Sequence, residues 1–154
     1  SPARARRPSG DDGAVAEPPR GHRLLPHTAD VMVEAWGPDL AACCEEAVAA
    51  LAAVHLDVAR AVVAGRRDAH LPPAPPDRLV LAALDEAIFL LDTADGVPVA
   101  AEVRPAADGG LDVTFQLADP ATVEPTGAVP KAVSSEVELD EGADGVRCRV
   151  VVDV

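Results

Sequence analysis

Aromatic side chains and lysine are scarce in this chain of 154 residues. One Trp, two Phe and no Tyr make up 2% of the sequence, and Lys131 is its single lysine. Proteins that hold single-stranded nucleic acid stack bases on aromatic side chains and follow the backbone with basic ones. A chain with so few aromatic residues offers no stacking platform for bases, so direct nucleic-acid binding is not expected of it.

Basic residues are outnumbered 13 to 26 by Asp and Glu, which gives a formal net charge of −13. A surface of that sign repels phosphate backbones and anionic lipid headgroups. The sequence also lacks any run of the roughly 20 apolar residues that a membrane-spanning helix requires. These observations predict a folded protein that has no membrane partner.

Three cysteines provide neither a disulfide framework nor a CxxC metal pattern, which favours a reducing compartment, and the first residues show no apolar h-region. We therefore expect a cytoplasmic protein. The nucleotide and catalytic signatures GxxxxGK[ST], GxGxxG, GxSxG and HExxH are also missing. Their absence predicts that this chain binds no nucleotide itself and is not an enzyme.

Residues 1–20 are rich in Pro, Gly and charge without periodicity, a composition expected of a disordered tail, and residues 21–154 form the single domain. Within that domain, apolar residues alternate as in strands or recur at three and four as in helices. Asp77 is expected to cap the second helix. The pattern predicts strands at 31–36, 97–103, 111–117 and 146–152, one or two strands at 58–70, helices at 38–55 and 77–95, and a less regular stretch at 119–138. The order favours an α+β fold, with two helices packed on a largely antiparallel β-sheet.

Cys43 and Cys44 occupy consecutive positions of the first expected helix. Consecutive helical positions point about 100° apart and cannot both face one core. We expect ordinary packing of one thiol in the core and the other at its boundary.

Four short segments, in order along residues 21–154, carry a resemblance to the archease family. They are His-Thr-Ala-Asp-Val at 27–31, Leu-Asp-Glu at 84–86, Pro-Lys-Ala-Val at 130–133 and Val-Val-Asp-Val at 151–154. Members of that family are accessory proteins of the RNA-splicing ligase that joins tRNA exon ends. The resemblance implies that this chain docks on such a ligase, promotes guanylylation of the ligase's active-site histidine from GTP and so permits multiple turnover. It also implies that this chain meets RNA only indirectly, through the ligase.

The resemblance also implies a site. Asp30 and Asp153 would share a divalent cation, with the free carboxylate of Val154 as a third oxygen donor, and all-oxygen ligation selects a hard ion such as Ca²⁺ or Mg²⁺. Alternatively, Asp30 only bonds backbone in a turn and Asp153 is a solvated end residue. Lys131 would act in activation of the partner, pair with the acidic site, or be a solvated surface lysine. His27 would act in the same activation, serve as a ligand, orient Asp30, or simply be a hydrogen-bonded turn histidine.

The chain departs from the family pattern at two places. Residues 131–136 read Lys-Ala-Val-Ser-Ser-Glu where archeases usually read Lys-Ala-Val-Thr-Tyr-His, and residues 83–86 read Ala-Leu-Asp-Glu in place of an aromatic residue followed by Leu-Asn-Glu. Two other functions stay open. One is a chaperone-like modulator of a tRNA methyltransferase, and the other is a small metal-dependent hydrolase built on Asp30 and Asp153, against which stands the lack of a general base beyond His27.

Overall fold

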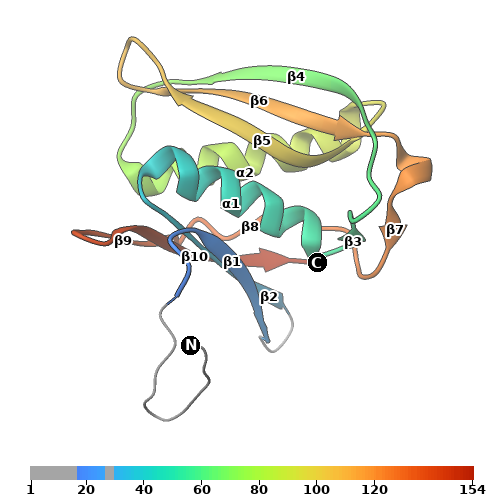
Figure 1. Cartoon of the computed structure of the whole chain (residues 1–154), viewed down its shortest axis with the longest axis horizontal. Helices are drawn as coiled ribbons and strands as arrows, with labels where there is room; N and C mark the ends of the chain where they lie inside the picture. The colour runs from blue at the N-terminus through green and yellow to red at the C-terminus, as the bar shows by residue number, and fades with distance from the viewer. Residues whose placement is uncertain (1–16, 27–29) are drawn as a thin grey trace.

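The computed structural model describes residues 17–26 and 30–154. Most of the expected tail lies outside this part of the chain, and its last residues, 17–20, contact the domain. The elements, drawn in Figure 1, are β1 (Gly21–Pro26), β2 (Asp30–Gly37), α1 (Leu40–Ala53), β3 (Leu56–Asp57), β4 (Val63–Leu71), α2 (Pro76–Thr93), β5 (Val97–Pro105), β6 (Leu111–Ala118), a 3₁₀ turn (Pro120–Thr122), β7 (Glu124–Pro125), β8 (Ala132–Val133), β9 (Glu138–Gly142) and β10 (Gly145–Asp153).

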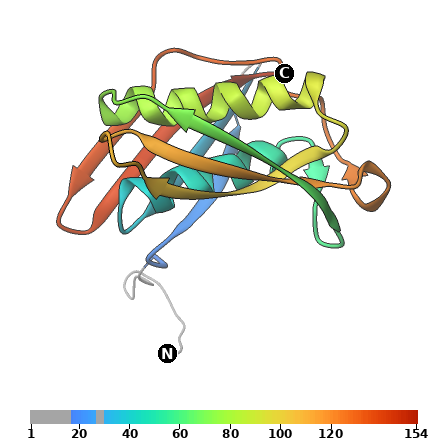
Figure 2. The ribbon, with the colours of Figure 1, turned by 90° about the horizontal axis from the view of Figure 1, so that it is seen from above.

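Two antiparallel sheets enclose the helices. One sheet has the order β1-β2-β10-β8, with β9 also paired to β10, and the other has the order β4-β6-β5. Both helices lie between these sheets (Figures 1 and 2), and β3 and β7 form a small separate ribbon. The predicted α+β class with largely antiparallel strands is confirmed, and the strands divide into two layers instead of one.

Helix α1 is buried along most of its surface because it contacts β2 on one side and β5 on the other. Asp39 caps it, the carboxylate accepting a hydrogen bond from the Ala42 amide at 2.8 Å. The buried residues of α1 include small ones such as Ala42, Ala47 and Ala50, and these let both sheets pack close to the helix. The expectation that Cys43 and Cys44 cannot both be buried is wrong, since each is 0% exposed, and the second sheet is the physical reason.

Helix α2 confirms the predicted apolar stripe, but its start differs. The residue before the helix is Pro75, which offers no side-chain cap, and Pro76 occupies the first turn, where its fixed φ suits a helix. Asp77 therefore lies inside the first turn, where a carboxylate interacts favourably with the helix dipole. The buried stripe consists of Leu79, Val80, Ala83, Leu84, Ala87 and Leu90.

The hairpin of β5 and β6 turns at the expected place. Gly109 adopts a φ of +93°, and the Asp108 carboxylate accepts a hydrogen bond from the Gly110 amide at 2.8 Å. Of the one or two strands expected at 58–70, the structure forms one, β4, which begins at Val63. Residues 58–62 form a turn instead, in which the Asp57 carboxylate accepts from the Ala59 amide. No helix in the described part of the chain is long and apolar enough to cross a membrane.

Candidate functional site

The pairing of β2 with β10 brings the first and last strands of the large sheet together. In this antiparallel pair Asp153 lies directly opposite Asp30, and on its other side Asp153 lies opposite Ala132 of β8. Directly opposed residues have their side chains on the same sheet face, with Cβ atoms about 4.5–5.5 Å apart. The fold thus places Asp30 and Asp153 side by side at one end of the sheet.

The face on which they lie follows from the burial pattern of β10. Val150 and Val152 are buried against the helices, whereas Asp153 is exposed. Because side chains of a strand alternate, Asp153 points away from the helices, and so does its neighbour Asp30, which is half-buried. The two aspartates therefore lie on the outer face of the sheet.

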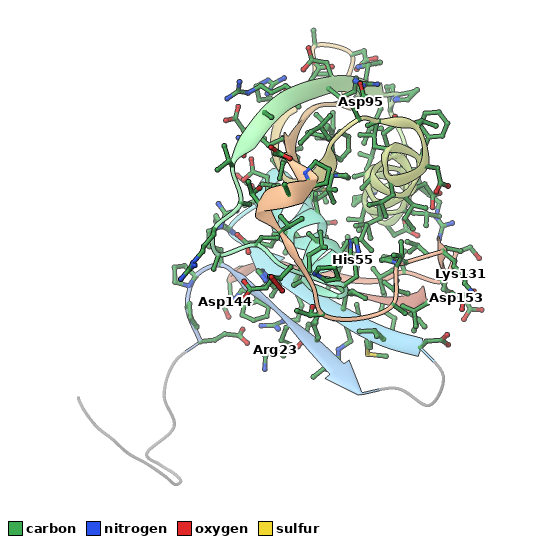
Figure 3. All side chains as sticks on the ribbon, turned by 90° about the vertical axis from the view of Figure 1, so that its right-hand side faces the viewer. Arg23, His55, Asp95, Lys131, Asp144 and Asp153 are labelled. Carbon is green, nitrogen blue, oxygen red and sulfur yellow. The ribbon has the colours of Figure 1, made fainter. Side chains whose placement is uncertain are left out.

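Lys131 reaches the same end through the backbone. Its amide donates a hydrogen bond to the Asp153 carbonyl at 2.8 Å, and its side chain is exposed. The Ser134 amide donates to the Val151 carbonyl at 2.9 Å, which fixes this segment along the last strand. Figure 3 shows Lys131 and Asp153 at one end of the molecule. Val154, the last residue of the chain given, is half-buried beside them.

His27, the remaining residue expected at this site, lies outside the described residues. The structure therefore brings together Asp30, Asp153, Lys131 and Val154. Among residues 17–26 and 30–154, no group of three or more His, Cys, Asp and Glu side chains is placed to hold a metal ion. The expected cation site has only two such side chains, and its third donor would be a main-chain carboxylate. The donors are all oxygen atoms, which fits a hard divalent cation.

A second polar cluster on the same sheet face was not predicted. Glu34 is 4% exposed, and its carboxylate oxygens lie 3.0 Å from the Nε atoms of both Arg23 and Arg149. Arg147 lies 3.5 Å from Glu34. The Glu34 carboxylate raises the pKa of Arg149. Arg23 and Arg147 also stack over Trp36, at 4.6 and 4.8 Å from the ring centroid. The sequence indicated only that Glu34 and Trp36 share one face of their strand, since their arginine partners lie on the strands β1 and β10.

The segment 17–20 covers this cluster. Glu17 forms ion pairs with Arg23 and Arg147, and the Pro18 carbonyl accepts a hydrogen bond from the Trp36 indole at 3.0 Å. Arg20 reaches past the sheet to Glu46 on α1, at 2.6 Å. These contacts satisfy the charges of the cluster within the chain. The cluster therefore has the character of a structural ion-pair network.

A third cluster lies on the other sheet. Exposed His70 meets the Asp112 carboxylate through Nδ1 and the Asp108 carboxylate through Nε2, each at 2.8 Å. These hydrogen bonds, that to Asp112 first, raise the pKa of His70. The sequence showed no ligand spacing for this histidine, and its partners come from the β5–β6 hairpin.

Comparison with known proteins bears on the whole domain. A model of the Archease protein family matches residues 22–154. The probable protein archease of Mycobacterium tuberculosis strain H37Rv is 43% identical over 135 residues, which covers 87% of this chain and 75% of that protein, and the same holds for strain CDC 1551. The solution structure of Methanobacterium thermoautotrophicum protein 1598 matches with a TM-score of 0.70 and 23% identity, covering 87% of this chain and 99% of that one. At 23% identity this last match concerns the fold alone.

Proposed function

The chain belongs to the archease family, and from this premise we propose that it is a non-catalytic accessory protein that activates a GTP-dependent RNA ligase in tRNA splicing or RNA repair. In this role it promotes guanylylation of the ligase and permits multiple turnover. The observation that carries the proposal is the register of β2 and β10, which sets Asp30 opposite Asp153 beside Lys131. These are the residues of the motifs that resemble the family.

The opposed aspartates are the part of the site best suited to a cation. Like charges directly across a strand pair are unfavourable, and a shared divalent ion relieves that cost. Asp30, Asp153 and the Val154 carboxylate would hold Ca²⁺ or Mg²⁺ with oxygen atoms alone. A divalent cation supplies positive charge to phosphate oxygens during nucleotidyl transfer. The chain's own part is to hold the two carboxylates at fixed spacing on two hydrogen-bonded strands.

Lys131 is the residue that we assign to contact with the partner. It is exposed, while its backbone is fixed to Asp153, so its ammonium group extends from an anchored position. Lys side chains bind phosphate as compact point charges. His27 is assigned to the same activating contact on the family motif alone.

The net charge of the chain supports a protein partner with a basic surface. An enzyme that ligates RNA has a basic cleft for the phosphate backbone, and a chain of net charge −13 is attracted to such a surface. Attraction of this kind raises the association rate and weakens with salt. The acidic end of the sheet is the part that we expect to enter the cleft.

The test is multiple-turnover RNA ligation by the cognate ligase, with and without this protein. We expect ligation beyond a single turnover only when the protein is present, and strong loss of this effect in Asp30→Asn, Asp153→Asn and Lys131→Ala. Asp144→Asn is the matched control, because Asp144 is an exposed carboxylate that directly precedes β10, whereas Asp153 ends this strand. It should activate like the wild type.

Other outcomes identify other functions. An unchanged ligase turnover together with a changed specificity of a tRNA methyltransferase would support the modulator. Hydrolysis of nucleotides or phosphodiesters by the protein alone, lost in Asp30→Asn, would support the hydrolase. A version extended by residues after Val154 tests the third oxygen donor, because the extension removes the carboxylate from that position and should weaken cation binding.

A further inference from the structure

Two thiols, those of Cys43 and Cys148, meet in the core between α1 and the large sheet. Cys43, Cys44 and Cys148 are all free and 0% exposed. The Cys43 thiol lies 3.6 Å from Cys148 Sγ and 3.5 Å from the Ala35 carbonyl oxygen. The two cysteines are 105 positions apart in the sequence. Neither the family motifs nor the proposed function uses this pair.

The separation of the two sulfur atoms is short enough for a bond. A disulfide has an S–S length of about 2.05 Å, so the sulfur atoms must approach each other by about 1.6 Å in total. Shared equally, this is a movement of about 0.8 Å by each sulfur atom. We infer that Cys43 and Cys148 are a redox site, a dithiol that a small peroxide converts into a disulfide joining α1 to β10.

The hydrogen bond between the thiols assigns their roles. Because Cys43 donates its proton to Cys148 Sγ, this bond favours the thiolate of Cys148 and lowers its pKa, while the same bond and burial raise the pKa of Cys43. The thiolate is the nucleophile toward peroxides. Cys148 is therefore the sulfur that reacts first, and Cys43 is the resolving thiol.

The reaction balances with hydrogen peroxide as the oxidant. Cys148 Sγ attacks one peroxide oxygen, the O–O bond breaks, and a sulfenic acid and one water form. Cys43 Sγ then attacks Cys148 Sγ, the S–O bond breaks, and a second water leaves with the Cys43 proton. Two thiols and one peroxide thus give one disulfide and two waters.

Burial decides which oxidants can act. A side chain with no exposed surface cannot meet a bulky disulfide such as oxidised glutathione without opening of the fold, whereas hydrogen peroxide is close to water in size. Cys44 is equally buried, and burial raises its pKa to about 12, so it is a poor nucleophile. The site is therefore selective for a small oxidant and for one pair of thiols.

The crosslink would join segments far apart in the chain. A disulfide that closes a loop of about 100 residues restricts the unfolded chain strongly in the loop-entropy model. For a domain of this size we expect the melting temperature to rise by roughly 5–10 °C on oxidation. Reduction with dithiothreitol should restore the original value.

The test is treatment of the folded protein with hydrogen peroxide, followed by alkylation, intact mass measurement and peptide mapping without reduction. We expect loss of two hydrogen atoms, a peptide crosslink between Cys43 and Cys148, and alkylation of Cys44 after unfolding. Oxidised glutathione at equal oxidising capacity should give no crosslink in the folded protein. Cys44→Ala is the matched control and should still form the crosslink, whereas Cys43→Ala should stop at a sulfenic acid on Cys148.

Three results would overturn the inference: free thiols at all positions after peroxide, a crosslink that includes Cys44, or sulfinic acid at Cys148 of the wild type without a crosslink. The wild-type measurements alone decide these outcomes, so the inference stays testable even where a cysteine variant folds poorly.

Discussion

Removing the Glu34 charge should destabilise the fold without affecting activation of the partner. Glu34 is buried, and its carboxylate contacts the Nε atoms of Arg23 and Arg149 at 3.0 Å each. In Glu34→Gln the side chain keeps its shape but loses the charge, so the guanidinium groups face a neutral amide. The variant therefore isolates the contribution of the charge.

The magnitude follows from the two close contacts. A hydrogen bond to a charged group contributes about 1.5–3 kcal/mol. The buried Glu34 carboxylate loses this charge-assisted part in the amide variant, while water around the half-exposed arginines keeps the total toward the lower end of that range. We expect a loss of about 2 kcal/mol in the free energy of unfolding. For a chain of this length that corresponds to a fall of roughly 4–8 °C in melting temperature.

Urea unfolding and thermal melting measure this loss. Glu138→Gln is the matched control, because Glu138 lies opposite Arg149 on β9 but is exposed, and it should change stability by no more than about 0.5 kcal/mol. If Glu34→Gln is as stable as this control, the cluster is not a structural network. If Glu34→Gln folds normally but no longer activates the ligase, the arginine cluster belongs to the functional surface instead.

Three further predictions concern the acidic end, His70 and the core. Ca²⁺ or Mg²⁺ should raise the melting temperature of the wild type, because a cation that binds only the folded state stabilises it. Asp153→Asn should abolish that rise, and an equal rise in the wild type and the variant would exclude the proposed cation site. Asp112 and Asp108 raise the pKa of His70 in the folded protein. The protonated His70 therefore stabilises the fold fully at a pH below the pKa that His70 has in the unfolded chain, and this stabilisation is lost as the pH rises through its pKa in the folded protein. NMR titration should place that pKa above about 6.5 and lower it in Asp112→Asn; a value at or below 6.5 contradicts this. Leu51→Ala should cost roughly 2–5 kcal/mol by unfolding while sparing activation by folded protein, and lost activation in the folded fraction would mean that Leu51 also shapes the site.

The sequence predicts local elements well where a single period dominates. The apolar stripe of α2 and the alternation on both sides of Asp108-Gly109-Gly110 depend only on neighbours in the chain, and the structure confirms both. The cap at Asp77 is wrong because Pro76, immediately before it, already occupies the first helical turn, for which its fixed φ is suited. Where a helix begins depends on which of several adjacent residues is best suited to its first turn, and the spacing of apolar residues carries no information about this.

The pairing of distant strands is the part that sequence patterns leave open. Nothing in the alternation of β10 says that it lies between β2 and β8, or that β4, β5 and β6 form a separate sheet. One sequence feature is nevertheless informative in retrospect. Helix α1 carries small apolar residues around most of its circumference, including Cys43 and Cys44, and a helix that is apolar on all sides is buried on all sides. That composition indicates a helix enclosed between two layers.

The candidate site was predicted unevenly for the same reason. Asp30, Lys131 and Asp153 were found through motifs that resemble a family, while their proximity rests on strand register, which the spacing of residues does not provide. The contacts of Glu34 with Arg149 and of Cys43 with Cys148 join segments more than 100 positions apart in the sequence. Such contacts have no local signature, so no reading of single segments finds them.

The arrangement along the outer face of the large sheet keeps its basic and acidic ends apart. Arg149 and Asp153 lie on the same face of β10, four residues and about 13 Å apart, which is too far for an ion pair. Between them on this face lie Met32 and Val151, which are opposite each other on β2 and β10. Two apolar side chains therefore separate Arg149 from Asp153. Because Glu34 holds Arg149 at 3.0 Å, this arginine is not available to neutralise Asp153. The ion-pair network therefore retains Arg149 beside Glu34 at one end of the outer face, apart from Asp153 at the other end.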